Sequence, residues 1–470
     1  MIPIRKTIVS FSVLAALIIA HTVTTTTTSA LDATSQLNNY IKTSLDTYQI
    51  PGASAVIQKG GKTLLQNSWG HSSDGSKVTA DTPFLIGSLS KPITASAILL
   101  LAQDETVRLD EPIKTYLPDF RYSSKSNQQI TVRHLLEQTS GISPSDGLNV
   151  TDRSYKQPGA ISQAVTALNN VTLQSTPGTA YSYTSANYLL LGAIIESASN
   201  KSYSEFVTTR IFAPLAMDHT SATQQASSDD GLVSGYSSWI GRPIKSTGFY
   251  DNSGAPYGYI SSTASDIMKF LQFMQNGGVI LNDQSMQLFK TIPKEKTYGI
   301  GWFYSPESKY FYHGGATPDF RAEMFYYPDR DFSGVILTNK YHNLEDQQVA
   351  DIMNSARAIA DGRSPSQLPN QSYMTQWTIL SVVALLLGWL SYATYRFTKP
   401  ATHVQRNRII SSILIVLSLG LGLGFPTIFG APWHSIILFA PDIAVLSILL
   451  IILLVLIASV LLFQGQKRTK

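Results

Sequence analysis

Ser88 and Lys91 are the residues whose types and spacing first indicate chemistry. They lie three residues apart in FLIGSLSKPITASAILLLAQ (84–103), an apolar segment that predicts a helix. Side chains at i and i+3 of a helix are neighbours, so the lysine amine could take the serine proton. That transfer needs a lowered lysine pKa, which burial and the positive end of a helix dipole both supply. The alternative is a helix-capping serine followed by a solvated lysine, and the pair alone favours this alternative.

A second motif is PGTAYSYTSANYLLLG (177–192), which places Tyr183 in a polar, aromatic loop before a predicted helix over 186–200. A phenol near a cation ionises more readily, so Tyr183 could share proton transfer with Lys91. The alternative is that Tyr183 is one of several half-buried aromatic residues.

The third motif, YHGGATPDFRAEMFYYP (312–328), contains His313, Gly314 and Gly315 on a predicted strand. Glycines remove obstructing side chains, so backbone amides there stay open to a substrate carbonyl. The amides of Ser88 and Ala316 could then form an oxyanion hole. A glycine turn beside a surface histidine is the alternative.

The motifs GSLSK, YTSANY and HGGA, in this order and at this wide spacing, resemble the active-site set of serine β-lactamases of class C type and of their penicillin-binding-protein and esterase relatives. The resemblance covers about 33–339. It implies an α+β, β-lactamase/transpeptidase-like fold and a serine hydrolase that needs no metal or other cofactor. It also implies the catalytic residues Ser88 (nucleophile), Lys91 (general base) and Tyr183 (proton relay), and the substrate-binding or oxyanion residues Ser185, His313, Gly314, Gly315 and Ala316.

One position departs from the family pattern. The second motif usually reads Tyr-x-Asn, whereas Ser185 stands third here, and Asn187 does not align with the missing asparagine. A serine hydroxyl can still hydrogen-bond a substrate amide. Because serine stands in place of the usual asparagine, efficient turnover of β-lactams is nevertheless not expected.

The patterns of the chain itself predict mixed α and β structure. Two strand-like runs flank Gly60-Gly61, helices are predicted over 131–141, 186–200 and from Thr263, and four strands are predicted between 296 and 339. We therefore expect an antiparallel sheet built from both ends of the domain, flanked by helices, with a helical region inserted.

Composition excludes several classes of function. The 470 residues contain no cysteine and eight scattered histidines, so disulfides, a thiol nucleophile and a metal site are not expected. The net charge of +4 comes from the C-terminal part, where seven basic residues and one acid follow residue 376. The remainder is slightly acidic, so the basic balance does not indicate nucleic-acid binding.

Both ends of the chain indicate a membrane. Residues 1–30 are typical of a signal peptide, with an uncleaved anchor helix as the alternative. A catalytic domain over 33–360 and a linker over 361–376 precede three apolar runs, about 377–395, 409–428 and 443–463, within a membrane segment over 377–465. Buried core helices are the alternative for these runs, but three in succession favour membrane spans.

Charge placement predicts the orientation of these spans. The loop after the first span carries four basic residues and the C-terminal tail carries three, whereas the loop between the second and third carries no Lys or Arg. By the positive-inside rule we expect a multi-pass protein of the cell membrane, with an extracytoplasmic catalytic domain and a cytoplasmic C-terminal tail.

The substrate remains open at this point. The domain plan resembles membrane-bound peptidases that remove an N-acyl-D-amino-acid cap from peptide prodrugs, the colibactin-maturation peptidase among them, so a D-amino-acid peptide, a cell-wall peptide or a related acyl compound is expected. Two alternatives are a catalytically weak penicillin-binding sensor and an esterase of wall polymers or small molecules.

Overall fold

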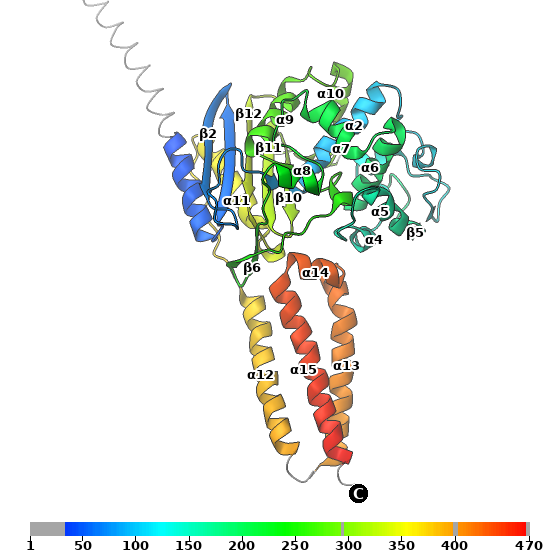
Figure 1. Ribbon diagram of the computed structural model, residues 1–470, viewed down its shortest axis with the longest axis vertical. Helices are drawn as coiled ribbons and strands as arrows, with labels where there is room; N and C mark the ends of the chain where they lie inside the picture. Colours follow the sequence, from blue (N-terminus) through cyan, green and yellow to red (C-terminus); the bar gives the residue numbers. More distant parts are fainter. Residues whose placement is uncertain (1–32, 293–295, 398–402, 467–470) are drawn as a thin grey trace, which may run out of the picture.

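The structure is a computed structural model that describes residues 33–292, 296–397 and 403–466. A head of strands and helices, 33–360, lies at one end of three long helices that run side by side and are called the rods below (Figure 1). The signal-peptide prediction for 1–30 lies outside the described residues.

The head is organised around a six-stranded antiparallel sheet. Its strand order is β2-β1-β12-β11-β10-β9. The strands are β1 (Gly52–Lys59), β2 (Lys62–Gly70), β9 (Phe303–Ser305), β10 (Tyr310–Thr317), β11 (Phe320–Tyr327) and β12 (Phe332–Thr338). Because β1 pairs with β12, both ends of the head meet in one sheet, as the sequence predicted.

Helices cover both faces of this sheet (Figure 1). A helix over 33–47 and α11 (Gln347–Ala360) bury Leu37, Ile41 and Ile352 against one face. The other face packs against α9 (Ala264–Asn276), and beyond it lies α2 (Ser90–Gln103), which is buried along nearly its whole length. Such all-round burial explains why apolar residues are found on every side of α2.

The chain between α2 and α9 forms the predicted helical region. It contains α3 (Val132–Leu136), α4 (Pro144–Val150), α5 (Ala160–Leu168), α6 (Ser185–Ser199), α7 (Tyr203–Val207) and α8 (Gln224–Asp229), with α10 (Asp283–Phe289) after α9. The short strands are β3 (Phe84–Leu85), β4 (Tyr122–Ser123), β5 (Val171–Thr172), β6 (Tyr236–Trp239), β7 (Arg242–Lys245), β8 (Ser261–Ser262) and β13 (Lys340–Tyr341).

Two predicted elements are shorter than expected. The helix predicted to run to Gly141 ends at Leu136, because Gln138 turns left-handed (φ 58°) and its side chain accepts from Thr184 N. The strand predicted over 296–304 is reduced to β9, because Gly301 (φ 79°) turns the chain against α2, where a Cβ would lie 3.1 Å from Pro92 Cα.

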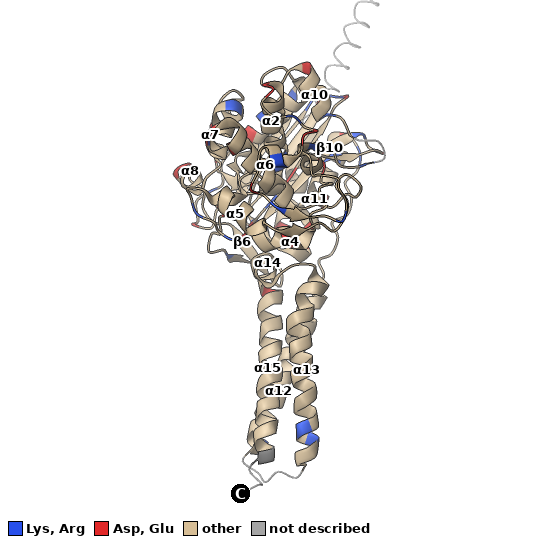
Figure 2. Ribbon diagram, turned by 90° about the vertical axis from the view of Figure 1, so that its right-hand side faces the viewer, with Lys and Arg blue, Asp and Glu red and all other residues tan. Residues whose placement is uncertain are grey.

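The C-terminal helices are α12 (Met374–Phe397), α13 (Val404–Phe429), α14 (Trp433–Phe439) and α15 (Pro441–Gln466). By length and composition α12, α13 and α15 could each cross a membrane, and they contain the three predicted runs. Figure 2 shows charged residues crowded on the head and nearly absent from the three long helices, except for an acidic residue at the head-side end of α15 and basic residues at the far end of α13. The short helix α14 was not predicted, and it lies between rods and head.

Candidate active site

Ser88 and Lys91 meet at the junction of two helical segments. Ser88 lies in a 3-10 turn, Gly87–Leu89, and α2 begins at Ser90, so Lys91 stands in the first turn of α2. The predicted single helix from Ser88 is thus divided, yet the i, i+3 relation survives. Lys91 Nζ lies 2.8 Å from Ser88 Oγ and donates to the Tyr257 carbonyl oxygen, also at 2.8 Å. The Tyr257 carbonyl, which sequence reasoning missed, orients the amine.

The surroundings of Lys91 are apolar and aromatic. Its side chain is fully buried, and its Nζ lies 5.0 Å from the ring centroid of Tyr183, 5.8 Å from that of Tyr188 and 6.0 Å from that of Tyr257. Burial lowers the pKa of Lys91 to about 7, although the nearby Asp152 carboxylate opposes the shift. A large share of the lysine is therefore an uncharged amine near neutral pH, able to accept a proton.

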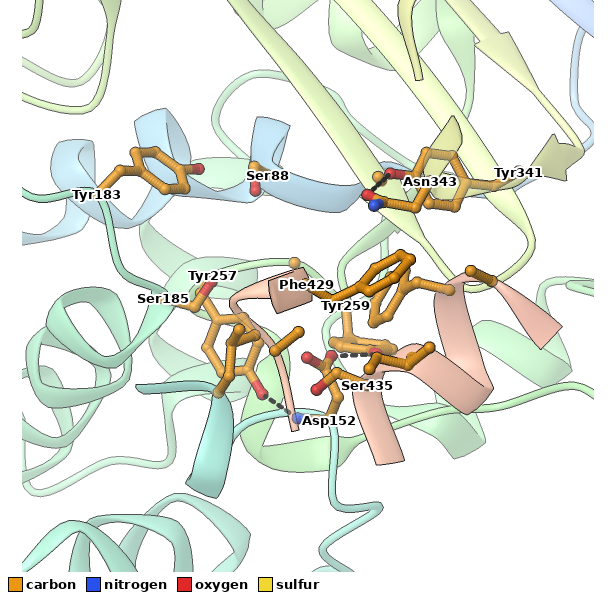
Figure 3. A pocket seen from close by; sticks show the side chains of 17 residues that line it. Ser88, Asp152, Tyr183, Ser185, Tyr257, Tyr259, Tyr341, Asn343, Phe429 and Ser435 are labelled. Atoms are coloured by element: carbon orange, nitrogen blue, oxygen red, sulfur yellow. Dashed lines mark hydrogen bonds between the residues drawn. The ribbon is translucent and has the colours of Figure 1, made fainter. Parts of the chain in front are cut away.

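Tyr183 stands beside this pair. It precedes α6, whose start is capped by the Thr184 side chain. Figure 3 shows its hydroxyl directed toward Ser88. Burial raises the pKa of Tyr183, while a hydrogen bond with Ser88 partly offsets the shift. The expectation that a neighbouring cation would ease its ionisation is therefore wrong, because desolvation of the phenolate is the larger effect. Tyr183 is a protonated phenol near neutral pH.

Two glycines bring strand β10 against the Ser88 turn. Gly87 is left-handed (φ 56°), and a Cβ there would lie 2.2 Å from Ala316 N. A Cβ on Gly315 would lie 2.0 Å from Ile86 O and 2.9 Å from Ser88 N. Neither contact is possible for a real side chain, so both positions require glycine. The backbone amides of Ser88 and Ala316 consequently lie at one edge of the site.

His313 and Gly314 lie on strand β10, as the third motif predicted, but neither lines the cavity in front of Ser88. His313 is buried (1% exposed) among aromatic rings, with ring centroids 5.2 Å from Phe303 and 6.3 Å from Tyr183. Burial, with a smaller effect of Lys91, lowers the pKa of His313 to about 3, so it is neutral and does not bring a charge to the substrate. A Cβ on Gly314 would lie 2.6 Å from Glu323 Oε1, away from Ser88.

A cavity of about 370 Å³ opens in front of Ser88. Ser88, Tyr183, Ser185 and Ala316 line it, whereas the buried Lys91 and His313 stand behind its wall. Asn187 lies outside it, because its amide donates to Gln138 Oε1 and accepts from Ser140 Oγ in the interior. Among the residues that the structure describes, no group of three His, Asp or Glu side chains is placed to hold a metal ion.

Asp152 also lines the cavity, and no sequence motif singled it out (Figure 3). It accepts from the Tyr259 hydroxyl at 2.6 Å, and its backbone amide donates to the Tyr257 hydroxyl at 3.3 Å. Burial raises the pKa of Asp152 to about 6. The carboxylate is part of the electrostatic environment of Lys91. It lies 61 residues further along the chain, in a loop without any motif, so no local signal marked it.

The fold and this site define a class of protein. The profile of the Beta-lactamase family matches residues 37–356, more than half of the chain, so the chain belongs to that family and is one of its serine hydrolases. The predicted family and fold are thereby confirmed.

Individual relatives extend this assignment. Protein flp of Staphylococcus aureus (strain COL) is 26% identical over 465 residues, covering 93% of this chain and 92% of its own. A match of that length includes part of the C-terminal rods. D-amino acid amidase from Ochrobactrum anthropi SV3, solved with L-phenylalanine amide, is 26% identical with a TM-score of 0.57, covering 69% of this chain and 99% of its own. An octameric penicillin-binding protein homologue from Pyrococcus abyssi has a TM-score of 0.62 at 22% identity, covering 74% and 81%.

Proposed function

We propose that this serine hydrolase is anchored in the membrane by its three C-terminal helices and forms an acyl-enzyme through Ser88 on an amide or ester outside the cytoplasm. One observation carries the proposal. A fully buried lysine amine, with its pKa lowered to about 7, lies 2.8 Å from a serine hydroxyl that lines a cavity.

Acylation begins with proton transfer from Ser88 Oγ to the uncharged amine of Lys91. One N–H of the amine donates to the Tyr257 carbonyl, which directs the lone pair toward Ser88. Ser88 Oγ attacks the substrate carbonyl carbon, and the carbonyl oxygen gains the negative charge. The amides of Ser88 and Ala316 stabilise this oxyanion.

Collapse of the tetrahedral intermediate breaks the bond to the leaving nitrogen or oxygen. Tyr183 donates its proton to that leaving group and recovers a proton from the Lys91 ammonium. The raised pKa of Tyr183 supports this role, because the resting phenol keeps the proton it must donate. Water then attacks the acyl-enzyme while its proton passes to Lys91. The ester bond to Ser88 Oγ breaks, the Lys91 ammonium returns that proton to Ser88 Oγ, and the acid product leaves. Ser185 and His313 assist substrate binding, Ser185 by hydrogen bonding and His313 by packing behind Tyr183.

The substrate class is an amide or ester with a D-amino-acid, cell-wall peptide or related acyl group. The name of the amidase from Ochrobactrum anthropi supports a D-amino-acid amide. Ser185 at the position of the usual asparagine weighs against rapid β-lactam hydrolysis. D-alanyl peptides, N-acyl-D-amino amides, β-lactams and short acyl esters are the compounds to compare.

The decisive experiment treats the full-length protein in nanodiscs with a fluorophosphonate and measures intact mass. The wild type should gain one adduct, and Ser88→Ala should gain none. Ser96→Ala is the matched control, because Ser96 lies in α2 but bonds the Pro92 carbonyl. An adduct on the Ser88→Ala protein at the wild-type rate would contradict the proposal.

The orientation is tested on a clean background, because the chain contains no cysteine. Ser308→Cys on the head and Arg406→Cys beyond the first span are both at exposed positions. A membrane-impermeant maleimide added to intact cells should label the first variant and leave the second unlabelled. The reverse pattern would invert the proposed topology.

A second candidate function is a sensor that is acylated slowly and reports occupancy through the membrane. The observation that favours it is that the end of α13 and the segment joining α13 to α15 contribute residues to the cavity wall. Adduct formation by a fluorescent penicillin without turnover of any compound in the comparison would favour the sensor over the enzyme.

A further inference from the structure

One wall of the catalytic cavity comes from the membrane segment. The hairpin between the second and third rods, from the end of α13 through α14 to the start of α15, contributes six lining residues, Phe429, Ala431, Ser435, Ile436, Phe439 and Ala440. Figure 3 shows Ser88 and Tyr183 on one side of the cavity and Phe429 and Ser435 across from them. The site is therefore composite.

The wall formed by the hairpin is mostly apolar, and apolar residues of the head lie around it. Phe429, Ile436 and Phe439 face the cavity from the hairpin, and Leu148, Tyr259 and Tyr341 face it from the head. Asp152 is the one carboxyl among the described lining residues, and the Tyr259 hydroxyl already bonds it. Water forms few hydrogen bonds with such surfaces. An apolar substituent that binds there is favoured, because its apolar surface is removed from water.

The hairpin is held against the head by contacts that use buried polar groups. Asp442, 1% exposed, accepts from Ile240 N at 3.0 Å, and its Oδ1 lies 2.7 Å from His342 Nε2. The rings of Phe439 and Tyr341 meet edge to face, with centroids 5.9 Å apart. Because buried polar groups need hydrogen-bond partners, these contacts favour a defined position of the wall.

The position of the wall decides what it is suited to bind. The hairpin joins two helices that could each cross a membrane, and it lies at their head-side ends (Figure 1). The cavity consequently stands at the level where a bilayer surface would meet the head. An amphiphile lying in that bilayer would have its apolar part near α14 and its polar part near Ser88.

We propose that α14 and the flanking ends of α13 and α15 form a subsite for an apolar acyl or alkyl group of the substrate, which is thus an amphiphile cleaved at the membrane surface. The inference rests on the proposed function and deepens it. Ile436 and Phe439 contact the apolar group directly, and Asp442 is a positioning residue that holds the wall. The cavity of about 370 Å³ falls within the roughly 300–1,000 Å³ of ligand pockets.

The test measures hydrolysis of p-nitrophenyl acetate, butyrate, hexanoate and octanoate by the full-length protein in nanodiscs. Each buried methylene should raise kcat/KM about fourfold, so hexanoate should exceed acetate by a factor on the order of 10². Ile436→Trp fills the subsite and should reduce the hexanoate-to-acetate ratio at least tenfold. Ile437→Trp is the matched control, because Ile437 is the next residue and 48% exposed, and it should keep the wild-type ratio.

Two further variants guard against misfolding of Ile436→Trp. Phe439→Ala enlarges the subsite and should shift the preference toward octanoate. Asp442→Ala loosens the wall and should lower the hexanoate-to-acetate ratio. For acetate, kcat/KM should still rise with pH through about 7, because Lys91 is unchanged. The subsite proposal would be overturned if the wild type hydrolysed all chain lengths equally, or if Ile436→Trp and Ile437→Trp had equal hexanoate-to-acetate ratios. Acetate hydrolysis in those cases would still support the proposed function. A wild-type protein that hydrolysed none of these esters and formed no fluorophosphonate adduct would instead overturn the proposed function.

Discussion

Lys91 Nζ lies 2.8 Å from Ser88 Oγ in a position that water does not reach, since Lys91 is fully buried. Its two polar partners are the Ser88 hydroxyl and the Tyr257 carbonyl, and neither carries a charge. An ammonium held in this way loses much of its solvation, which is why the lysine pKa falls to about 7.

Replacement of this amine is the first prediction. Lys91→Met keeps a long apolar side chain among the rings of Tyr183, Tyr188 and Tyr257, so the protein should remain folded. Acylation of Ser88 should slow by about 10²–10⁴, the range for loss of a general base. The measurement is the rate of fluorophosphonate adduct formation by intact mass, with circular dichroism as the check on folding. Unchanged acylation would remove Lys91 from the proposed chemistry.

The pH dependence gives a second prediction. Acylation needs the uncharged amine, so kcat/KM should rise as pH increases through about 7 and level off above it. Asp152, ionised above pH of about 6, raises the Lys91 pKa through its negative charge. Asp152→Asn removes that charge while an amide oxygen can still accept from Tyr259, so the acid limb should move to lower pH.

A control for that shift is Asp104→Asn, which removes a carboxylate that pairs with Arg210 on the surface. It should leave the acid limb in place. An acid limb that stays in place or moves to higher pH in the Asp152→Asn protein would show that the Asp152 charge does not raise the pKa of Lys91.

Tyr183 can be tested through the leaving group. Tyr183→Phe should slow hydrolysis of an amide by about 10²–10⁴, because an amine leaves only when protonated. A p-nitrophenyl ester, whose phenolate leaves without a proton, should slow by less than about tenfold in the same variant. The comparison uses kcat/KM for a D-alanyl amide and for p-nitrophenyl acetate. Equal losses on both compounds would make Tyr183 a packing residue.

The glycine at position 87 gives a stability prediction. Gly87→Ala places a Cβ 2.2 Å from Ala316 N at φ 56°, so it should lower the free energy of unfolding through both backbone strain and overlap. Gly60 has nearly the same φ, 59°, and a Cβ added there would meet no atom within 4 Å. Gly60→Ala should therefore cost only the strain, about 1 kcal/mol, whereas overlap should add roughly 1–3 kcal/mol at Gly87.

Thermal unfolding in detergent and the rate of Ser88 acylation are the two measurements for this pair. Gly87→Ala should lower Tm more than Gly60→Ala and should also slow acylation, because Ala316 moves away from Ser88. If the two variants had similar Tm values and similar acylation rates, the close approach of β10 to the Ser88 turn would not be required for stability or for acylation.

The motifs predicted the centre of the site because its chemistry is local. Ser88 and Lys91 are three residues apart, and any helical backbone places them side by side. Tyr183 and the third motif were predicted by resemblance, and the structure brings Tyr183 and Ala316 to the same cavity. The roles of these residues remain predictions until the variants are measured.

Local sequence patterns were sufficient to predict the two-strand hairpin around Gly60-Gly61, the sheet formed by both ends of the head, the Thr263 cap and three helices apolar enough for a membrane. The hairpin, the cap and the apolar helices follow from periodicity, turn residues and composition, which need no distant partner. The sheet was predicted from the order of strand-like and helix-like segments along the chain. Three other relations depended on the tertiary fold: His313 is buried and neutral, the Asp152 carboxylate acts on the pKa of Lys91, and Ile436 and Phe439 line a cavity with Ser88. These relations join residues far apart in the chain, and long-range packing and desolvation, which no local pattern encodes, bring them together.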